Sequence, residues 1–143
     1  MPGSTTSARL LSGLLIGAGV AHFVVPRQFD AIVPRSLPGS PRTWTRLSGL
    51  AEIAVGASVA HPRTRGAGAL AAAGLFTAVF PANVKMAYDW RHRPAPLRAA
   101  ALARLPLQVP LVLWALRLHA DGSSPGSRTG RRPTGGRGGP AGS

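Results

Sequence analysis

Residues 66–84 read GAGALAAAGLFTAVFPANV, a stretch in which no side chain carries a charge. A helix that crosses the ~30 Å hydrocarbon core of a bilayer needs about 20 predominantly apolar residues. A helix of a soluble bundle keeps a polar face toward water, and this stretch has none. It therefore predicts a membrane-spanning helix, which we place at residues 66–88.

Three further apolar segments accompany it, at residues 8–25, 43–60 and 97–118. Short connections between helices favour antiparallel neighbours. Only helices or closed barrels span lipid, and these segments lack the alternation of barrel strands. We therefore predict an all-α integral membrane protein, a four-helix up-down bundle formed by residues 1–119. A signal peptide at residues 8–25 stays open as an alternative, although no small-residue cleavage site is obvious after it.

The composition limits the chemistry that the chain can perform. Its 143 residues include 17 Lys and Arg against 4 Asp and Glu, a formal net charge of +13, and no Cys. The lack of Cys excludes disulfides, thiol nucleophiles and thiolate metal sites. The arginines lie mostly between apolar runs and not in one patch. We therefore expect the lipid bilayer as the main partner of this charge and expect no nucleic acid.

The last part of the chain, residues 120–143, differs in composition from the rest. It is rich in Gly, Pro, Ser and Arg and has no aliphatic or aromatic residue larger than Ala. Such a segment cannot bury enough apolar surface to offset its ordering entropy, so we predict a disordered tail. An even number of spans places both termini on one side of the cell membrane. We expect that side to be cytoplasmic, because a basic tail suits an anionic inner leaflet.

The connection at residues 26–42 is more than a plain loop. Its apolar side chains are interleaved with charged ones, as in a segment that lies in the membrane interface. The apolar residues are Phe29, Ile32, Val33 and Leu37.

Six polar side chains fall within the predicted spans or in their last turns, where ionisable groups are costly and are therefore candidates for function. Because the helices alternate in direction, all six belong to the half of the membrane nearest residues 26–42. They are His22, Glu52, Asn83, Lys85, Arg104 and Gln108. The sequence assigns none of them a catalytic role.

Glu52 and Arg104 lie at matching depth in helices that run the same way, which predicts a buried ion pair between them. Ser48, Gly49 and Gly56 share a face with Glu52 and would let another helix approach closely. The pair could serve packing alone, or it could bind or move a proton, an ion or a ligand. Both alternatives stay open.

Pro81 removes a backbone donor from the third span and frees a carbonyl group, which Asn83 or Gln108 could satisfy. The histidines are too scattered to hold haem, and no set of residues has the spacing of a metal site, so we expect neither. Gly13 and Gly17 form a GxxxG motif. This motif predicts helix packing inside the bundle and leaves a homo-oligomer as the alternative.

The order of short motifs along residues 13–116 resembles the DoxX family of small four-helix membrane proteins. The two most specific matches are FPAN at 80–83 and RLPLQ at 104–108. The others include GVAHF at 19–23, IVP at 32–34, SG at 48–49 and EI at 52–53.

The resemblance implies a role near membrane redox chemistry. The family's name derives from a subunit of a thiosulfate–quinone oxidoreductase, and some members associate with membrane redox complexes. We therefore expect an accessory or membrane-anchor subunit with a membrane or soluble redox protein as its partner, in contact with quinone or lipid. Without Cys, the chain has no side chain for sulfur transfer, and we expect no catalysis by the chain alone. The alternatives are a small protein that transports a proton or a solute, and a purely structural membrane protein.

Overall fold

The computed structural model describes residues 2–123, and that part of the chain is helical with no strand. Pro at the first position of a helix is well tolerated, and α2 and α3 each begin with one. The helices are α1 (Pro2–Val24), α2 (Pro26–Asp30), α3 (Pro41–Ala60), α4 (Arg65–Ala78), α5 (Phe80–Asp89) and α6 (Ala95–Ser123).

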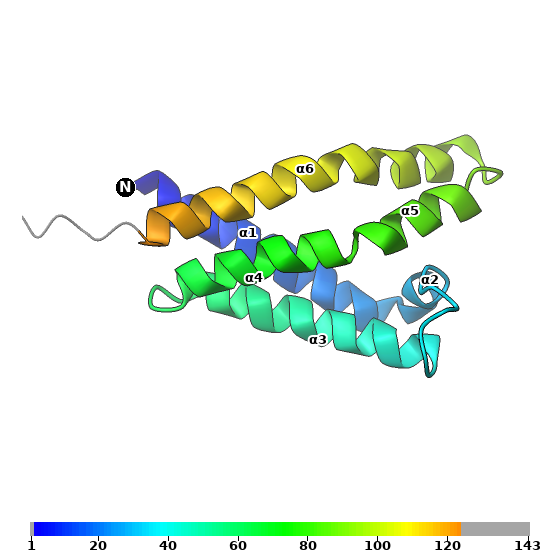
Figure 1. Cartoon of the computed structure of the whole chain (residues 1–143), viewed down its shortest axis with the longest axis horizontal. Coiled ribbons are helices and arrows are strands. Elements are labelled where there is room, and N and C mark those ends of the chain that lie inside the picture. Colours follow the sequence, from blue (N-terminus) through cyan, green and yellow to red (C-terminus); the bar gives the residue numbers. More distant parts are fainter. Residues whose placement is uncertain (1, 124–143) are drawn as a thin grey trace, which may run out of the picture.

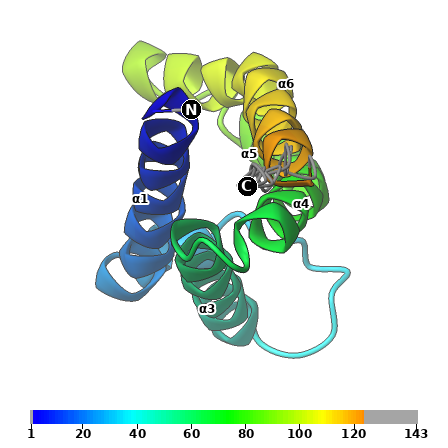
Figure 2. The ribbon, with the colours of Figure 1, turned by 90° about the vertical axis from the view of Figure 1, so that its left-hand side faces the viewer.

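The long helices lie side by side and alternate in direction (Figure 1). α1 packs mainly on α3, α3 packs on α4, and α4 packs on α6. Seen along their length, these four helices follow one another in the same order (Figure 2). α2 and the turn between α5 and α6 lie at one end of the molecule, which we call the α2 end. The start of α1 and the end of α6 lie at the opposite end.

The third predicted span is broken into two helices at Val79, where α4 ends and α5 begins. Pro81 causes the break because it has no backbone N–H to donate within the helix. Pro106 and Pro110, by contrast, lie inside the continuous helix α6. α6 extends to Ser123, so the predicted start of the disordered tail at residue 120 is wrong, and residues 120–123 are helical. The remainder of the predicted tail lies outside the described residues.

Three stretches of the described chain are long and apolar enough to cross a membrane: Thr5–Val24, Arg65–Asp89 and Ala95–Gly122. The second of them combines α4 and α5. α3 is not among these three stretches. It carries Arg42, Arg46 and Glu52 together with several hydroxyl side chains, which lower its apolar character.

Small residues bring α1 and α3 into close contact. A Cβ atom built on Gly49 would lie 2.8 Å from His22 Cβ, and one built on Gly56 would lie 3.1 Å from the carbonyl oxygen of Ser12. The hydroxyl of Ser12 donates a hydrogen bond to the Gly56 carbonyl at 2.7 Å. The predicted approach of a helix to Gly49 and Gly56 is therefore confirmed, and α1 is that helix.

The GxxxG motif does not take part in this packing. A Cβ atom on Gly13 or Gly17 would meet nothing within 4 Å. The prediction that this motif packs inside the molecule is wrong, because the close contacts of α1 are made by the face that carries Ser12 and Gly19.

Two groups of buried apolar side chains hold the helices together. The larger group joins α1, α3, α4 and α6 and consists of Ala8, Leu11, Leu15, Val59, Ala69, Ala72, Ala73, Phe76, Ala115 and Leu118. The smaller group joins α5 to α6 and consists of Met86, Ala87 and Ala101. Many large apolar side chains remain exposed, including Leu10, Leu50, Leu70, Leu102 and Val109. An apolar outer surface of this kind is expected of helices that face lipid.

Candidate functional site

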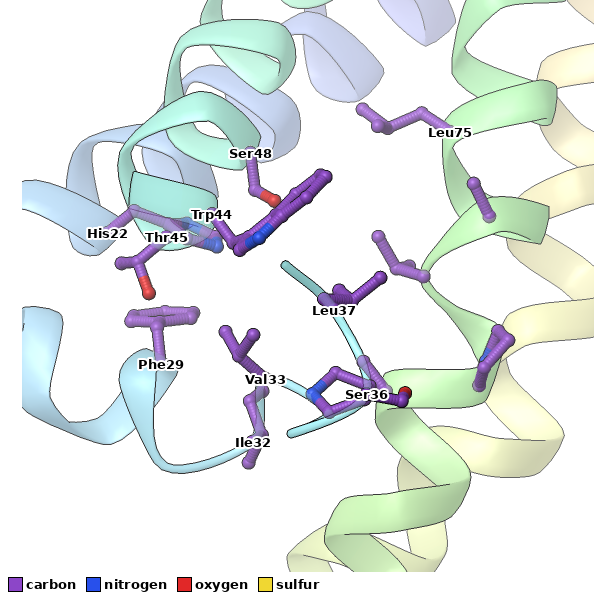
Figure 3. A pocket seen from close by; sticks show the side chains of 15 residues that line it. His22, Phe29, Ile32, Val33, Ser36, Leu37, Trp44, Thr45, Ser48 and Leu75 are labelled. Atoms are coloured by element: carbon purple, nitrogen blue, oxygen red, sulfur yellow. The ribbon is translucent and has the colours of Figure 1, made fainter. Parts of the chain in front are cut away.

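A pocket of about 500 Å³ lies near the α2 end, between α3 and the break that separates α4 from α5 (Figure 3). Pockets of this size commonly hold small molecules or cofactors. Its walls are mainly apolar and come from five parts of the chain. The lining residues include His22 of α1, Phe29 of α2, Val33 and Leu37 of the following loop, Trp44, Thr45 and Ser48 of α3, and Leu75, Ala78 and Pro81 around the break.

Asp30 fastens the floor of the pocket to α3. The Thr45 hydroxyl donates to Asp30 Oδ1 at 2.6 Å, and Arg42 Nε donates to Oδ2 at 2.8 Å. The hydrogen bond from Thr45 lowers the pKa of Asp30 below its ordinary value of 3.8, and the Arg42 side chain lowers it further. Partial burial acts in the opposite direction without reversing the shift. The ionised carboxylate therefore holds α2 in place.

The loop after α2 is fixed at a second point. Trp44 Nε1 donates to the carbonyl oxygen of Pro38 at 2.7 Å, which ties the loop to α3. The indole of Trp44 projects across the pocket, where Leu37 also points (Figure 3). The pocket is thus a built feature, with its floor and one wall held by named hydrogen bonds.

His22 is the buried ionisable residue in the pocket wall, with 8% of its surface exposed. Its ring stacks on Phe29, with ring centroids 3.8 Å apart and planes inclined by 26°. Nδ1 lies 2.9 Å from the carbonyl oxygen of Ala18. A carbonyl oxygen only accepts, so Nδ1 carries the proton in this hydrogen bond. Nε2 is then the nitrogen left for a ligand.

Glu52 stands behind His22. Its Oε2 lies 3.4 Å from His22 Nδ1, and the two side chains are only 13% and 10% exposed. Oε2 is buried and receives no hydrogen bond from any described residue. A buried carboxyl oxygen without a donor destabilises the fold, so its presence beside a pocket marks Glu52 as a functional candidate.

Asn83 and Gln108 form a second polar group beside the helix break. Asn83 Nδ2 donates to Gln108 Oε1 at 2.9 Å, and Gln108 Nε2 donates to the carbonyl oxygen of Phe76. Gln108 is buried. Pro81 was expected to free the carbonyl of Thr77, but Gln108 reaches that of Phe76, and Asn83 bonds Gln108 and not a carbonyl. Phe76 directly precedes Thr77 in the chain, so Gln108 bonds a carbonyl one residue before the expected one.

The other two candidates lie apart from both groups. Lys85 forms an ion pair with Asp89, one turn further along α5. Arg104 is exposed, and its Nη1 contacts Met86 Sδ at 3.9 Å. The six polar residues therefore do not form one cluster.

The predicted ion pair between Glu52 and Arg104 is wrong. Glu52 lies beside His22, whereas Arg104 faces outward next to α5. Two residues can lie at the same depth in different helices and still face different directions. α6 packs on α4 and α5, while α3 packs on α1 and α4, so the two charges point to different neighbours.

Sequence reasoning missed Asp30, Thr45 and Trp44 as parts of the site. The available signal was the pairing of an acidic residue in the 26–42 connection with basic and hydroxyl residues at the start of the next helix. Across residues 2–123, no three His, Asp or Glu side chains gather where a metal ion could bind.

These features define a class: a small all-helical protein with helices apolar enough to cross a membrane and an apolar pocket at one end. The chain belongs to the family described as a domain of unknown function (DUF8561), whose model matches residues 11–119. Comparison with curated proteins and with solved structures found no significant match.

Proposed function

We propose that this chain is a DoxX-like integral membrane protein that binds a quinone in the pocket beside His22 and serves as an accessory or membrane-anchor subunit of a redox system. The observation that carries the proposal is the apolar pocket with the buried His22 in its wall and Glu52 behind that ring. In this proposal a partner redox protein exchanges electrons with the bound quinone.

In the membrane, the proposed form is a four-helix up-down bundle. In it α3 crosses the bilayer in addition to the three apolar stretches in α1, in α4 and α5, and in α6. Supporting this, α3 is as long as the bilayer core requires and packs between α1 and α4, whose outer faces are apolar. The termini then share one side, which we assign to the cytoplasm. Carbonate extraction of membranes should leave the protein in the pellet, and reporters fused before Met1 and after Ser143 should give the same side.

The residues of the pocket fit a quinone head group. Phe29 and Trp44 offer aromatic faces for stacking, and the apolar walls suit an isoprenoid chain. His22 Nε2 can accept a hydrogen bond from a quinol hydroxyl, or donate one to a quinone oxygen when the ring is protonated. A bound quinone would supply two-electron redox chemistry. Glu52 Oε2, 3.4 Å from Nδ1, would stabilise the protonated ring by charge.

Photolabelling with an azido-quinone tests this function in membranes that contain the full chain. We expect labelled peptides from the α2–α3 region and competition by unlabelled quinone. Ala78→Phe fills the pocket from α4 and should abolish specific labelling. Ala71→Phe is the matched control, because Ala71 is exposed on the same helix and does not line the pocket. Equal labelling of both variants would reject the proposal.

A second candidate, a small proton-transporting protein, is favoured by the unpartnered Oε2 of Glu52. A buried carboxyl without a donor is typical of groups that take up and release a proton. Proton flux into liposomes that depends on Glu52 and needs no quinone would favour this candidate. Arg104, the residue first paired with Glu52, plays no part in it because of its outward position.

A further inference from the structure

A second hollow, of about 420 Å³, lies at the α2 end and shares no lining residue with the pocket beside His22. Its lining residues are Arg27, Gln28, Ala31, Trp90, Arg93 and Leu97. They come from α2 and the residue after it, from the turn between α5 and α6, and from the first turn of α6. Figure 1 shows these segments together at one end of the molecule. The floor is apolar, and two arginines stand at its edge.

The acidic side chains of this end are already engaged. Asp30 accepts from Arg42 and Thr45, and Asp89 pairs with Lys85. In the part of the chain that the structure describes, no acidic side chain lies within ion-pair distance of Arg27 or Arg93. Among residues 2–123, no side-chain hydrogen bond involves them either. Two unneutralised guanidinium groups beside one hollow favour an anionic ligand.

The position of the hollow along the spans indicates which anion it takes. The first apolar stretch ends at Val24, and Arg27 follows it by three residues. Arg93 lies between the second stretch, which ends at Asp89, and the third, which begins at Ala95. Both arginines are therefore at the level where lipid head groups begin. Trp90, which packs against the α5–α6 core, is a residue type typical of that level.

We propose that Arg27 and Arg93 bind the phosphate of an anionic phospholipid in this hollow, with an acyl chain running along Ala31, Trp90 and Leu97. Guanidinium groups bind phosphate through paired hydrogen bonds, and Leu97, which is 44% exposed, continues the apolar floor toward the lipid. A free phosphate ion would use the arginines but not the apolar floor. The proposal requires the membrane location and is independent of quinone binding.

Native mass spectrometry of the full chain, released from micelles containing equal amounts of phosphatidylglycerol and phosphatidylcholine, tests the site. The wild-type protein should retain phosphatidylglycerol preferentially. Arg27→Gln with Arg93→Gln should reduce that preference by roughly tenfold or more. The matched control, Arg35→Gln with Arg98→Gln, removes the same charge from the same end without altering the hollow, and should keep the preference.

Arg27→Lys with Arg93→Lys keeps both charges and should retain most of the preference, which also checks that the site tolerates substitution. Thermal unfolding of each variant shows whether it is folded. Equal retention of the two lipids by the wild type, or an equal loss in the control, would overturn the proposal. Equal retention of the two lipids, together with phosphate binding that depends on Arg27 and Arg93, would mean that the ligand is the free ion.

Discussion

Glu52 Oε2 lies 3.4 Å from Nδ1 of His22, across the close contact between α3 and α1. The closeness depends on the glycines on both sides of the contact, since larger residues at Gly19 or Gly49 would push the helices apart. The His–Glu pair and the packing of the two helices are therefore one feature. His22 reaches the pocket on its other side through its stacking on Phe29.

A double-mutant cycle should detect the interaction between these two side chains. We expect Glu52→Gln and His22→Gln to be coupled by about 0.5–3 kcal/mol in the free energy of unfolding, as residues in contact usually are. Arg104→Gln should change stability by no more than about 0.5 kcal/mol and show no coupling to Glu52, because Arg104 is exposed on another helix. Denaturant titration in mixed micelles measures the free energy of unfolding of each single and double variant. Coupling to Arg104 in place of His22 would restore the pairing that the sequence first predicted.

Two glycines of the α1–α3 region should respond in opposite ways to the same change. Gly49→Ala places a Cβ atom 2.9 Å from the carbonyl oxygen of Gly19 and should destabilise the protein by about 1–3 kcal/mol. Gly17→Ala meets nothing within 4 Å and should be neutral or slightly stabilising, since Ala favours a helix over Gly. Thermal unfolding of the two variants makes the comparison. A large loss in Gly17→Ala would instead reveal a contact with a second copy of the chain.

The floor of the pocket should loosen at acid pH. Asp30 has a lowered pKa in the folded protein, so its contribution to stability is complete above its ordinary value of 3.8 and is lost as the pH falls through the lower folded value. Thr45→Val removes the main cause and should move the pKa of Asp30 upward. Carbon NMR of the Asp30 carboxyl measures this pKa. Thr43→Val is the control, because the Thr43 hydroxyl forms a hydrogen bond with Ser40 and not with Asp30. An unchanged titration in Thr45→Val would show that another group sets this pKa.

Gln108 should be essential for the broken helix. Gln108→Leu leaves the Phe76 carbonyl and the Asn83 amide without partners, which should cost about 1–3 kcal/mol for each buried group. Hydrogen exchange should speed up in α5 around the break. Val109→Ala, at an exposed neighbouring position, should leave both stability and exchange nearly unchanged. Normal exchange in Gln108→Leu would mean that the break is held by other contacts.

The apolar segments were predictable because helix periodicity and length depend on local sequence. The predicted segments at 8–25, 43–60 and 97–118 correspond to α1, α3 and α6, and the third span differs only by its break at Val79. The proximity of Asn83 to Gln108 was also predictable from the sequence, because both belong to the region that Pro81 disturbs.

The partner of Glu52 was not predictable in the same way. Depth along a helix follows from counting residues, but the face that meets a neighbour depends on how each helix is rotated. The small residues near Glu52 indicated a close helix without saying which one. Asp30 was missed because its role depends on a loop folding back onto Thr45 and Arg42, which no local pattern shows.

Fluorescence of Trp44 during titration with a short-chain quinone tests the central claim most directly. Trp44 lines the pocket, and replacing Trp90 and Trp114 by Phe leaves it as the single tryptophan of the chain. We expect saturable quenching, abolished by Ala78→Phe and weakened roughly fivefold by His22→Phe, which removes one hydrogen bond. Quenching that rises linearly without saturation and is the same in Ala78→Phe would contradict a quinone site in this pocket.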